Sequence, residues 1–108
     1  MSNPQPTSNK LLKAVLEPLL EDFQYWFSRA LVLLESEDIS FLTADEQANL
    51  LERVKQAQKE VSTTQLLFKT LGEQAGVEPS VLLPWHTLVA ECWQVSLKWR
   101  SLKRDAQA

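Results

Sequence analysis

Glycine is nearly absent from this chain of 108 residues and occurs only at Gly72 and Gly76. A β-rich domain of this size needs many tight turns, whose corners usually hold glycine or an Asn-Gly pair. No Asn-Gly pair is present. The chain is therefore expected to form a few long elements, and its length is that of one ordinary domain.

The first long element is a helix expected from about Ser8 to Glu35. Its apolar residues recur at alternating steps of four and three, which is the heptad pattern of a helix that packs along one stripe. Pro18 interrupts this pattern, so the helix is predicted to be bent or broken near that residue. The stripe comprises Leu12, Leu16, Leu19, Phe23, Trp26, Ala30 and Leu33.

A second helix is predicted to begin after Thr43. Thr43 and Glu46 have the spacing of a capping box, in which each side chain accepts a hydrogen bond from a free backbone N–H. The usual hydrophobic staple is missing, because Gln47 occupies the fourth helical position. Gly72 or Gly76 is expected to end the helix. The apolar stripe comprises Leu50, Val54, Ala57, Val61, Thr64, Phe68 and Leu71.

A third helix is expected to follow the connection 72–80 and to begin near Ser80 or Pro84. Three helices with two short connections predict an all-α fold, an antiparallel three-helix bundle with long helices. The single helical domain is predicted to span residues 8–104, between tails at 1–7 and 105–108. The third stripe comprises Val81, Trp85, Leu88, Cys92, Val95, Trp99 and Leu102.

The three helices differ in how much apolar surface they carry. Residues 11–34 include 16 apolar side chains in 24 positions and residues 81–102 include 13 in 22, whereas residues 44–71 include 11 in 28. A bundle helix needs only one apolar stripe, so the first and third helices should have apolar surface left over. Such surface usually marks an interaction site, and Tyr25 and Trp93 are the candidates for a partner surface.

Charge and hydropathy narrow the range of partners. The net charge is −3, although residues 55–108 hold seven Lys or Arg and five Asp or Glu. The basic cluster near the end is interpreted as a solvated helix end, so no nucleic-acid partner is expected. No apolar run reaches the roughly 18 to 20 residues of a membrane span, and no signal-peptide pattern opens the chain. With a single cysteine, a cytoplasmic location is expected.

His86 supports an alternative interpretation. It is the only histidine and lies among aromatic residues, so an apolar pocket could use it as an axial ligand for a tetrapyrrole pigment. His86, Trp85 and Trp93 would line such a pocket. No second ligand accompanies His86, so no cofactor or metal is expected and a small-molecule carrier remains the alternative.

No combination of residues predicts catalysis. Cys92 and His86 are six positions apart and so lie on different helical faces, whereas a cysteine nucleophile needs its base within hydrogen-bond reach. Glu17 and Glu21 share a face but precede no histidine of a di-iron motif. Two glycines cannot form a phosphate-binding loop. The chain is therefore expected not to be an enzyme.

Three segments together, EDFQYWFSRALVLLE, EVSTTQLLFKT and LLPWHTLVAECWQVS, are similar to a family of short uncharacterised cyanobacterial proteins. The similarity covers roughly residues 10–100, and the last segment is the most specific. It implies a helical domain and a cyanobacterial cytoplasm, and it transfers no site residues. The leading hypothesis is a non-enzymatic module that binds a protein partner or a second copy of itself.

Overall fold

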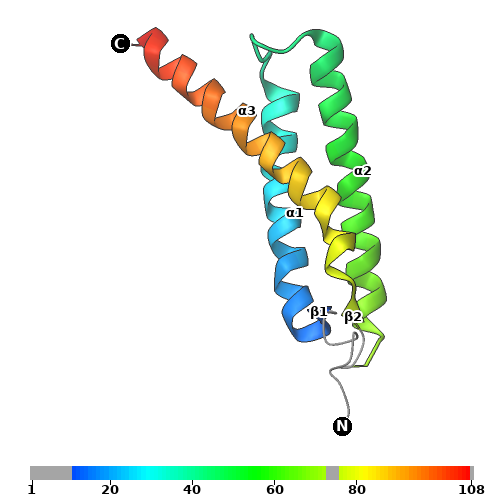
Figure 1. Cartoon of the computed structure of the whole chain (residues 1–108). Helices are drawn as coiled ribbons and strands as arrows, with labels where there is room; N and C mark the ends of the chain where they lie inside the picture. Colours follow the sequence, from blue (N-terminus) through cyan, green and yellow to red (C-terminus); the bar gives the residue numbers. More distant parts are fainter. Residues whose placement is uncertain (1–10, 73–75, 108) are drawn as a thin grey trace.

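The computed structural model describes residues 11–72 and 76–107. Within these ranges the chain forms three long α-helices, a short 3₁₀ helix and a pair of two-residue strands (Figure 1). The predicted all-α class is therefore confirmed. The elements in chain order are β1 (Leu11–Leu12), α1 (Lys13–Ser36), α2 (Ala44–Lys69), β2 (Gly76–Val77), η2 (Pro79–Leu82) and α3 (Leu83–Gln107).

The C-terminal boundary of the helical domain differs from the expected one. The helix α3 continues to Gln107, into the segment that the sequence analysis assigned to a tail. The N-terminal segment 1–7 and the expected helix start at Ser8 lie outside the described residues. In the part of the chain that the structure describes, no helix is long and apolar enough to cross a membrane.

The helix α1 continues through Pro18, so the predicted break is wrong, and a bend at this residue is not confirmed. Proline removes the single hydrogen bond that its N–H would donate to the carbonyl of Ala14, four residues earlier. Ala14 and Pro18 are both exposed. Water can therefore satisfy that carbonyl, and the helix loses one bond rather than its continuity.

The strands β1 and β2 close the end of the molecule where α1 begins. They pair antiparallel, with Leu11 opposite Val77 and Leu12 opposite Gly76. The helix predicted to begin near Ser8 wrongly included Leu11 and Leu12, because their apolar spacing also fits a helix. A Cβ atom on Gly76 would lie 2.7 Å from the carbonyl oxygen of Leu11. Glycine is therefore needed here for the close approach of two backbones.

The helix α2 does not end at a glycine, which corrects the expectation that Gly72 or Gly76 ends it. It ends at Lys69, and its C-cap is Thr70 in a right-handed helical conformation. The backbone N–H and the hydroxyl of Thr70 both donate to the carbonyl of Leu67, at 3.2 Å and 3.0 Å. A threonine thus satisfies a last-turn carbonyl that a glycine cap would otherwise have satisfied.

Two sets of side-chain hydrogen bonds stabilise the turn between α1 and α2. The predicted capping box is confirmed, because the N–H of Glu46 donates to Thr43 Oγ1 at 3.0 Å and the N–H of Thr43 donates to Glu46 Oε1 at 2.8 Å. In place of a hydrophobic staple, Gln47 donates from Nε2 to the carbonyls of Leu34 and Glu37, at 2.8 Å and 2.7 Å. Its Oε1 also accepts from the N–H of Ile39 at 2.9 Å.

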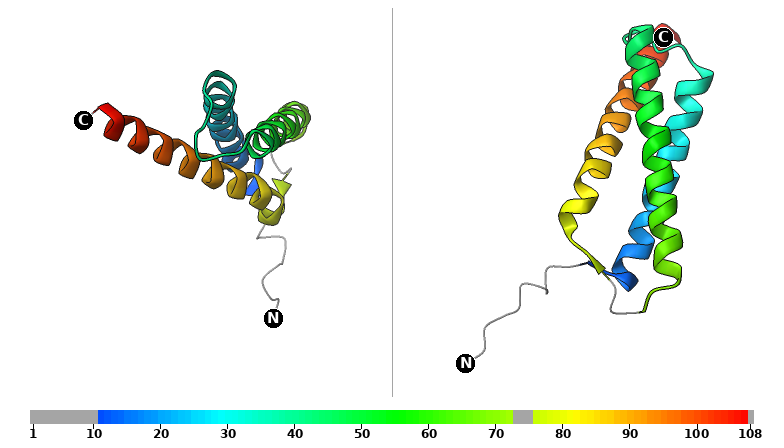
Figure 2. Two further views of the ribbon diagram at one scale, coloured as in Figure 1. Left: turned by 90° about the horizontal axis from the view of Figure 1, so that it is seen from above. Right: turned by 90° about the vertical axis from the view of Figure 1, so that its right-hand side faces the viewer.

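The helices α1 and α2 lie side by side and antiparallel, and the core runs between them (Figures 1 and 2). The predicted stripe of α2 is buried at five of its seven positions: Leu50, Val54, Ala57, Val61 and Phe68. On α1 the buried stripe differs from the predicted stripe at every second residue, where the buried residue lies one position later in the sequence. It comprises Leu16, Leu20, Phe23, Phe27, Ala30 and Leu34.

The helix α3 crosses the α1–α2 pair obliquely, as the view from above shows (Figure 2). Its first half is anchored, since Trp85, Leu88, Val89 and Cys92 are buried. Beyond Cys92 the apolar stripe of α3 is less completely buried. Two residues of the stripe are half-buried there, and several apolar residues around them are exposed. The crossing angle therefore leaves apolar surface on the second half of α3 and on the facing side of α1.

Candidate partner-binding groove between α1 and α3

The divergence of α3 from α1 opens a groove of about 870 Å³ between the two helices. Its lining runs from Tyr25 to Glu37 on the α1 side and from Cys92 to Lys103 on α3. On each helix the lining positions recur at steps of three and four, so each helix contributes one face. The groove is thus built from the apolar faces that α2 does not cover.

An aromatic cluster forms one end of the groove. The ring centroids of Tyr25 and Trp26 lie 5.0 Å apart at 78°, and those of Trp26 and Trp93 lie 5.1 Å apart at 81°. Both pairs have the edge-to-face geometry that aromatic quadrupoles favour. The side chains of Tyr25, Trp26 and Trp93 are 53%, 36% and 46% exposed. Large aromatic surface is therefore held in a fixed geometry while it is still open to solvent.

The local sequence explains why these aromatic residues face outward. Four aromatic residues occur within residues 23–27, which is more than one face of a helix can hold. Phe23 and Phe27 are four positions apart and enter the core, where their rings lie 6.1 Å apart. Tyr25 and Trp26 are consequently placed on the side that faces away from α2.

The middle of the groove is aliphatic and the opposite end is charged. Val32 and Leu97 line the middle and are exposed. At the far end, Lys103 Nζ lies 3.7 Å from Glu37 Oε1, which connects the second half of α3 to the end of α1. The groove therefore changes along its length from aromatic to aliphatic to charged.

Three cations line the groove, against one carboxylate. Arg29 donates from Nη1 to the hydroxyl of Tyr25 at 3.1 Å, and its guanidinium lies 5.7 Å from the centroid of the same ring. Arg100 and Lys103 line the groove from α3, and Glu37 is the carboxylate. The groove is locally cationic although the whole chain has a net charge of −3.

Both predicted partner-surface residues, Tyr25 and Trp93, line this groove, and Trp26 bridges them. Their role in binding a partner stays a prediction. The heptad pattern placed Trp26 on the buried stripe, so Trp26 was absent from the predicted partner surface. Its neighbours Phe23 and Phe27 could have supplied the missing signal, since a helix that buries both of them turns position 26 away from the core.

The three residues proposed for the alternative ligand site do not all line this groove. Trp85 is buried and donates from Nε1 to Glu60 Oε1 at 3.0 Å, which ties α3 to α2. His86 is exposed, and its ring lies edge-on to Phe23 with centroids 5.0 Å apart. Of the three, only Trp93 lines the groove.

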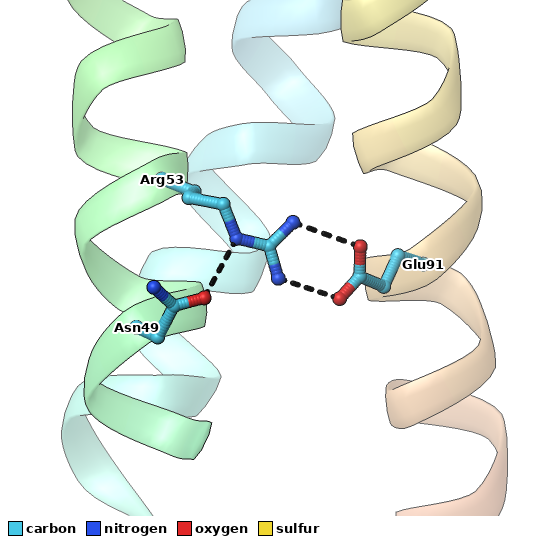
Figure 3. A network of polar contacts seen from close by, with 3 residues as sticks. All are labelled: Asn49, Arg53 and Glu91. Carbon is cyan, nitrogen blue, oxygen red and sulfur yellow. Dashed lines mark hydrogen bonds and ion pairs between the residues drawn. The ribbon is translucent and has the colours of Figure 1, made fainter. Parts of the chain in front are cut away.

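A polar clasp of Asn49, Arg53 and Glu91 connects α3 to α2 (Figure 3), and none of these residues lines the groove. The guanidinium of Arg53 donates to both carboxylate oxygens of Glu91, at 2.9 Å and 2.7 Å, and its Nε donates to Asn49 Oδ1 at 2.9 Å. The hydrogen bonds from Arg53 lower the pKa of Glu91, and those to Glu91 raise the pKa of Arg53. Such bidentate geometry also sets the relative positions of the two helices.

Cys92 is unsuited to nucleophilic chemistry in this position. Burial, together with the negative charge of Glu91, raises the pKa of its thiol to about 11. At neutral pH the side chain is therefore a thiol and not the reactive thiolate. Within the described ranges, no group of three or more His, Cys, Asp or Glu side chains is arranged to hold a metal ion.

A family model matches residues 6–101 of the chain. The chain belongs to the DUF2605 family. This family is described as a protein of unknown function, so membership of an uncharacterised family is confirmed. Comparisons with curated proteins and with solved structures give no match. The segment shared with the DUF2605 family includes Tyr25, Trp26 and Trp93 but ends before Lys103.

Proposed function

We propose that this DUF2605 protein is a non-enzymatic binding module, an antiparallel three-helix bundle whose third helix is splayed to receive part of a protein partner. The supporting observation is the groove lined by Tyr25, Trp26 and Trp93, in which aromatic rings are packed against one another but remain 36% to 53% exposed. Tryptophan and tyrosine contribute most of the binding free energy at many protein interfaces.

The rigidity of the aromatic cluster supports this function. Trp26 lies between Tyr25 and Trp93 in two edge-to-face contacts, so its side chain is already ordered before a partner binds. Association then costs less side-chain entropy than it would for mobile residues. A pigment carrier using His86 has less support, because His86 is outside the groove and lies against Phe23 instead.

The sequence similarity also leads us to propose a cyanobacterial host and a cytoplasmic location. A reducing compartment is compatible with the single cysteine, which is buried on α3 and does not form a disulfide within the chain. The proposed function is therefore tested in a lysate of a cyanobacterium that encodes the protein.

The test is affinity capture from that lysate with three baits: the wild type, Trp93→Glu and Leu66→Glu. Leu66 is a matched control, because it is 67% exposed and lies on α2, outside the groove lining. The wild type and Leu66→Glu are expected to retain the same partner, and Trp93→Glu is expected to lose it. Light scattering of each purified chain tests self-association in the same way.

Two results would contradict the proposed function. A monomeric wild type that captures no protein would remove the need for a binding surface. Retention of the partner by Trp93→Glu would show that the contact lies elsewhere on the molecule. Far-UV circular dichroism of all three baits checks the fold, and a Trp93→Glu chain that unfolds would show that Trp93 belongs to the core.

A further inference from the structure

We infer that the occupant of the α1–α3 groove is an acidic amphipathic helix of a different protein. This inference rests on the proposed function and specifies the chemistry of the partner. It is derived from three features of the groove: its length, the order of its lining residues, and the charges along it.

The length of the groove suits a short helix. Its lining runs from Tyr25 to Glu37 along α1 and from Cys92 to Lys103 along α3. At a rise of about 1.5 Å per residue, these segments are roughly 17 to 18 Å long. A helix of about twelve residues has this length. Such a helix presents apolar side chains at positions i, i+3 or i+4, and i+7, which is how amphipathic helices bind in hydrophobic grooves.

The lining offers two apolar regions for such side chains and charged residues beyond them. The aromatic cluster at one end and the pair Val32 and Leu97 in the middle can cover apolar side chains of the occupant. Arg100 and Lys103 lie toward the other end, and Arg29 lies beside Tyr25. Carboxylates that flank the apolar stripe of a bound helix would therefore meet cations along the groove.

Two of the three groove cations are available to a partner. Within residues 11–72 and 76–107, neither Arg29 nor Arg100 forms an ion pair, whereas Lys103 is paired with Glu37. The guanidinium of Arg29 is already positioned by the hydroxyl and the ring of Tyr25. Complementary charge at an interface contributes mainly specificity and association rate, and a partner with carboxylates is the one that this groove favours.

A second copy of the chain fits the groove less well than an acidic helix does. In a two-fold dimer the same patch meets itself. A groove-to-groove dimer would therefore bring Arg29, Arg100 and Lys103 toward the same three cations of the other copy. Like charges held close together at an interface are destabilising. A single-stranded nucleic acid also stacks on aromatic side chains, but it needs a continuous row of cations to follow its phosphate backbone, and this groove offers three cations beside a carboxylate.

The experiment measures the binding of three synthetic peptides to the purified full-length chain by isothermal titration calorimetry. The first peptide is a 14-residue amphipathic helix with leucines at i, i+4 and i+7 and glutamates on both flanks. In the second, lysines replace the glutamates. In the third, serines replace the leucines. Because several exposed ion pairs would each add a small contribution, the first peptide is expected to bind roughly tenfold tighter than the second at low salt. The third is expected not to bind.

A charge-reversal variant of the protein tests whether the cations of the groove cause the preference for the acidic peptide. The double variant Arg29→Glu, Arg100→Glu is expected to reverse the preference between the acidic and basic peptides. Lys59→Glu, Lys69→Glu is the matched control, because both lysines are exposed on α2, outside the groove, and the change in net charge is the same. This control should keep the preference for the acidic peptide. Circular dichroism verifies that both double variants remain helical.

The outcomes separate this inference from the proposed function. Equal affinity for the acidic and basic peptides, failure of the acidic peptide to bind, or preferential binding of an oligo(dT) strand would overturn the inference. So would a wild-type dimer that Trp93→Glu dissociates, although that result would uphold the groove as an interface. Loss of the native partner by Trp93→Glu but not by the double arginine variant would likewise uphold the function and reject the acidic helix.

Discussion

The two sides of α1 differ in how completely the neighbouring helix covers them. The side facing α2 is covered along its length, and Phe27 there is fully buried. The side facing α3 is covered only where the two helices cross, and Trp26, the preceding residue, is 36% exposed. Burial in this molecule is therefore set by the path of the covering helix and not by the apolar content of the covered one.

The burial of the two covering helices, α2 and α3, also depends on their paths. The helix α2 is the least apolar of the three, yet it buries five residues of its stripe against α1 because it runs alongside it. The helix α3 is richer in apolar residues, but beyond Cys92 it leaves Trp93 and Leu97 exposed because it diverges. A polar helix that is well aligned thus forms more of the core than an apolar helix that crosses obliquely.

The largest expected effect comes from truncating one aromatic residue on each side of α1. Phe27→Ala should lower the free energy of unfolding by about 3 to 5 kcal/mol, because it leaves a cavity in a fully buried site. Tyr25→Ala should lower it by less than about 1 kcal/mol, because the Tyr25 side chain is more than half exposed. Urea unfolding monitored by circular dichroism measures both values. Similar losses in the two variants would show that the α3 side is part of the stabilising core.

A smaller effect is expected at the turn that holds α2 alongside α1. Gln47→Ala removes three hydrogen bonds, to Leu34, Glu37 and Ile39, and leaves half-buried backbone groups without partners. Loss of this network should lower the free energy of unfolding by about 1 to 3 kcal/mol. Gln56→Ala is the control, because Gln56 is exposed on the same helix and should change stability by no more than about 0.5 kcal/mol. Equal stability of the two variants would mean that the capping box alone holds the turn.

Much of the fold followed from the sequence where local chemistry decides the structure. The capping box at Thr43 and Glu46 and the buried stripe of α2 were predicted correctly. The stripe of α1 was predicted less well, because a helix with apolar residues at two thirds of its positions offers two adjacent stripes. Only contact with α2 selects Leu20, Phe27 and Leu34 over their neighbours. Periodicity cannot make this choice by itself.

The candidate site could be predicted only in part, for a related reason. The sequence indicated that apolar surface would remain on the first and third helices, and it placed Tyr25 and Trp93 on that surface. It did not indicate the oblique crossing of α3, which brings Trp26 against Trp93 and exposes the groove. Nor did it indicate the strand pair at Gly76, since two-residue strands carry too little periodicity to be distinguished from a helix start.

The smallest expected effect concerns the ion pair between Arg53 of α2 and Glu91 of α3. The side chains of Arg53 and Glu91 are 44% and 42% exposed, so solvent screening limits their pair to about 0.5 to 1 kcal/mol. The hydrogen bonds from Arg53 lower the pKa of Glu91 in the folded state. A carboxyl group with a lowered folded pKa stabilises the fold above its unfolded pKa of about 4.3, and this contribution is lost as the pH falls through the folded value.

Glu91→Gln should therefore be less stable than the wild type by about 0.5 to 1 kcal/mol at pH 7. The difference should shrink toward zero as the pH falls from about 5 to below the folded pKa of Glu91, because the protonated carboxyl group then resembles the amide. Urea unfolding of both chains across this range measures the difference at each pH, and added salt should reduce it at pH 7. A difference that stays constant with pH would show that the clasp acts through packing and not through charge, and that the crossing of α3 is fixed by Trp85 and the buried residues around it.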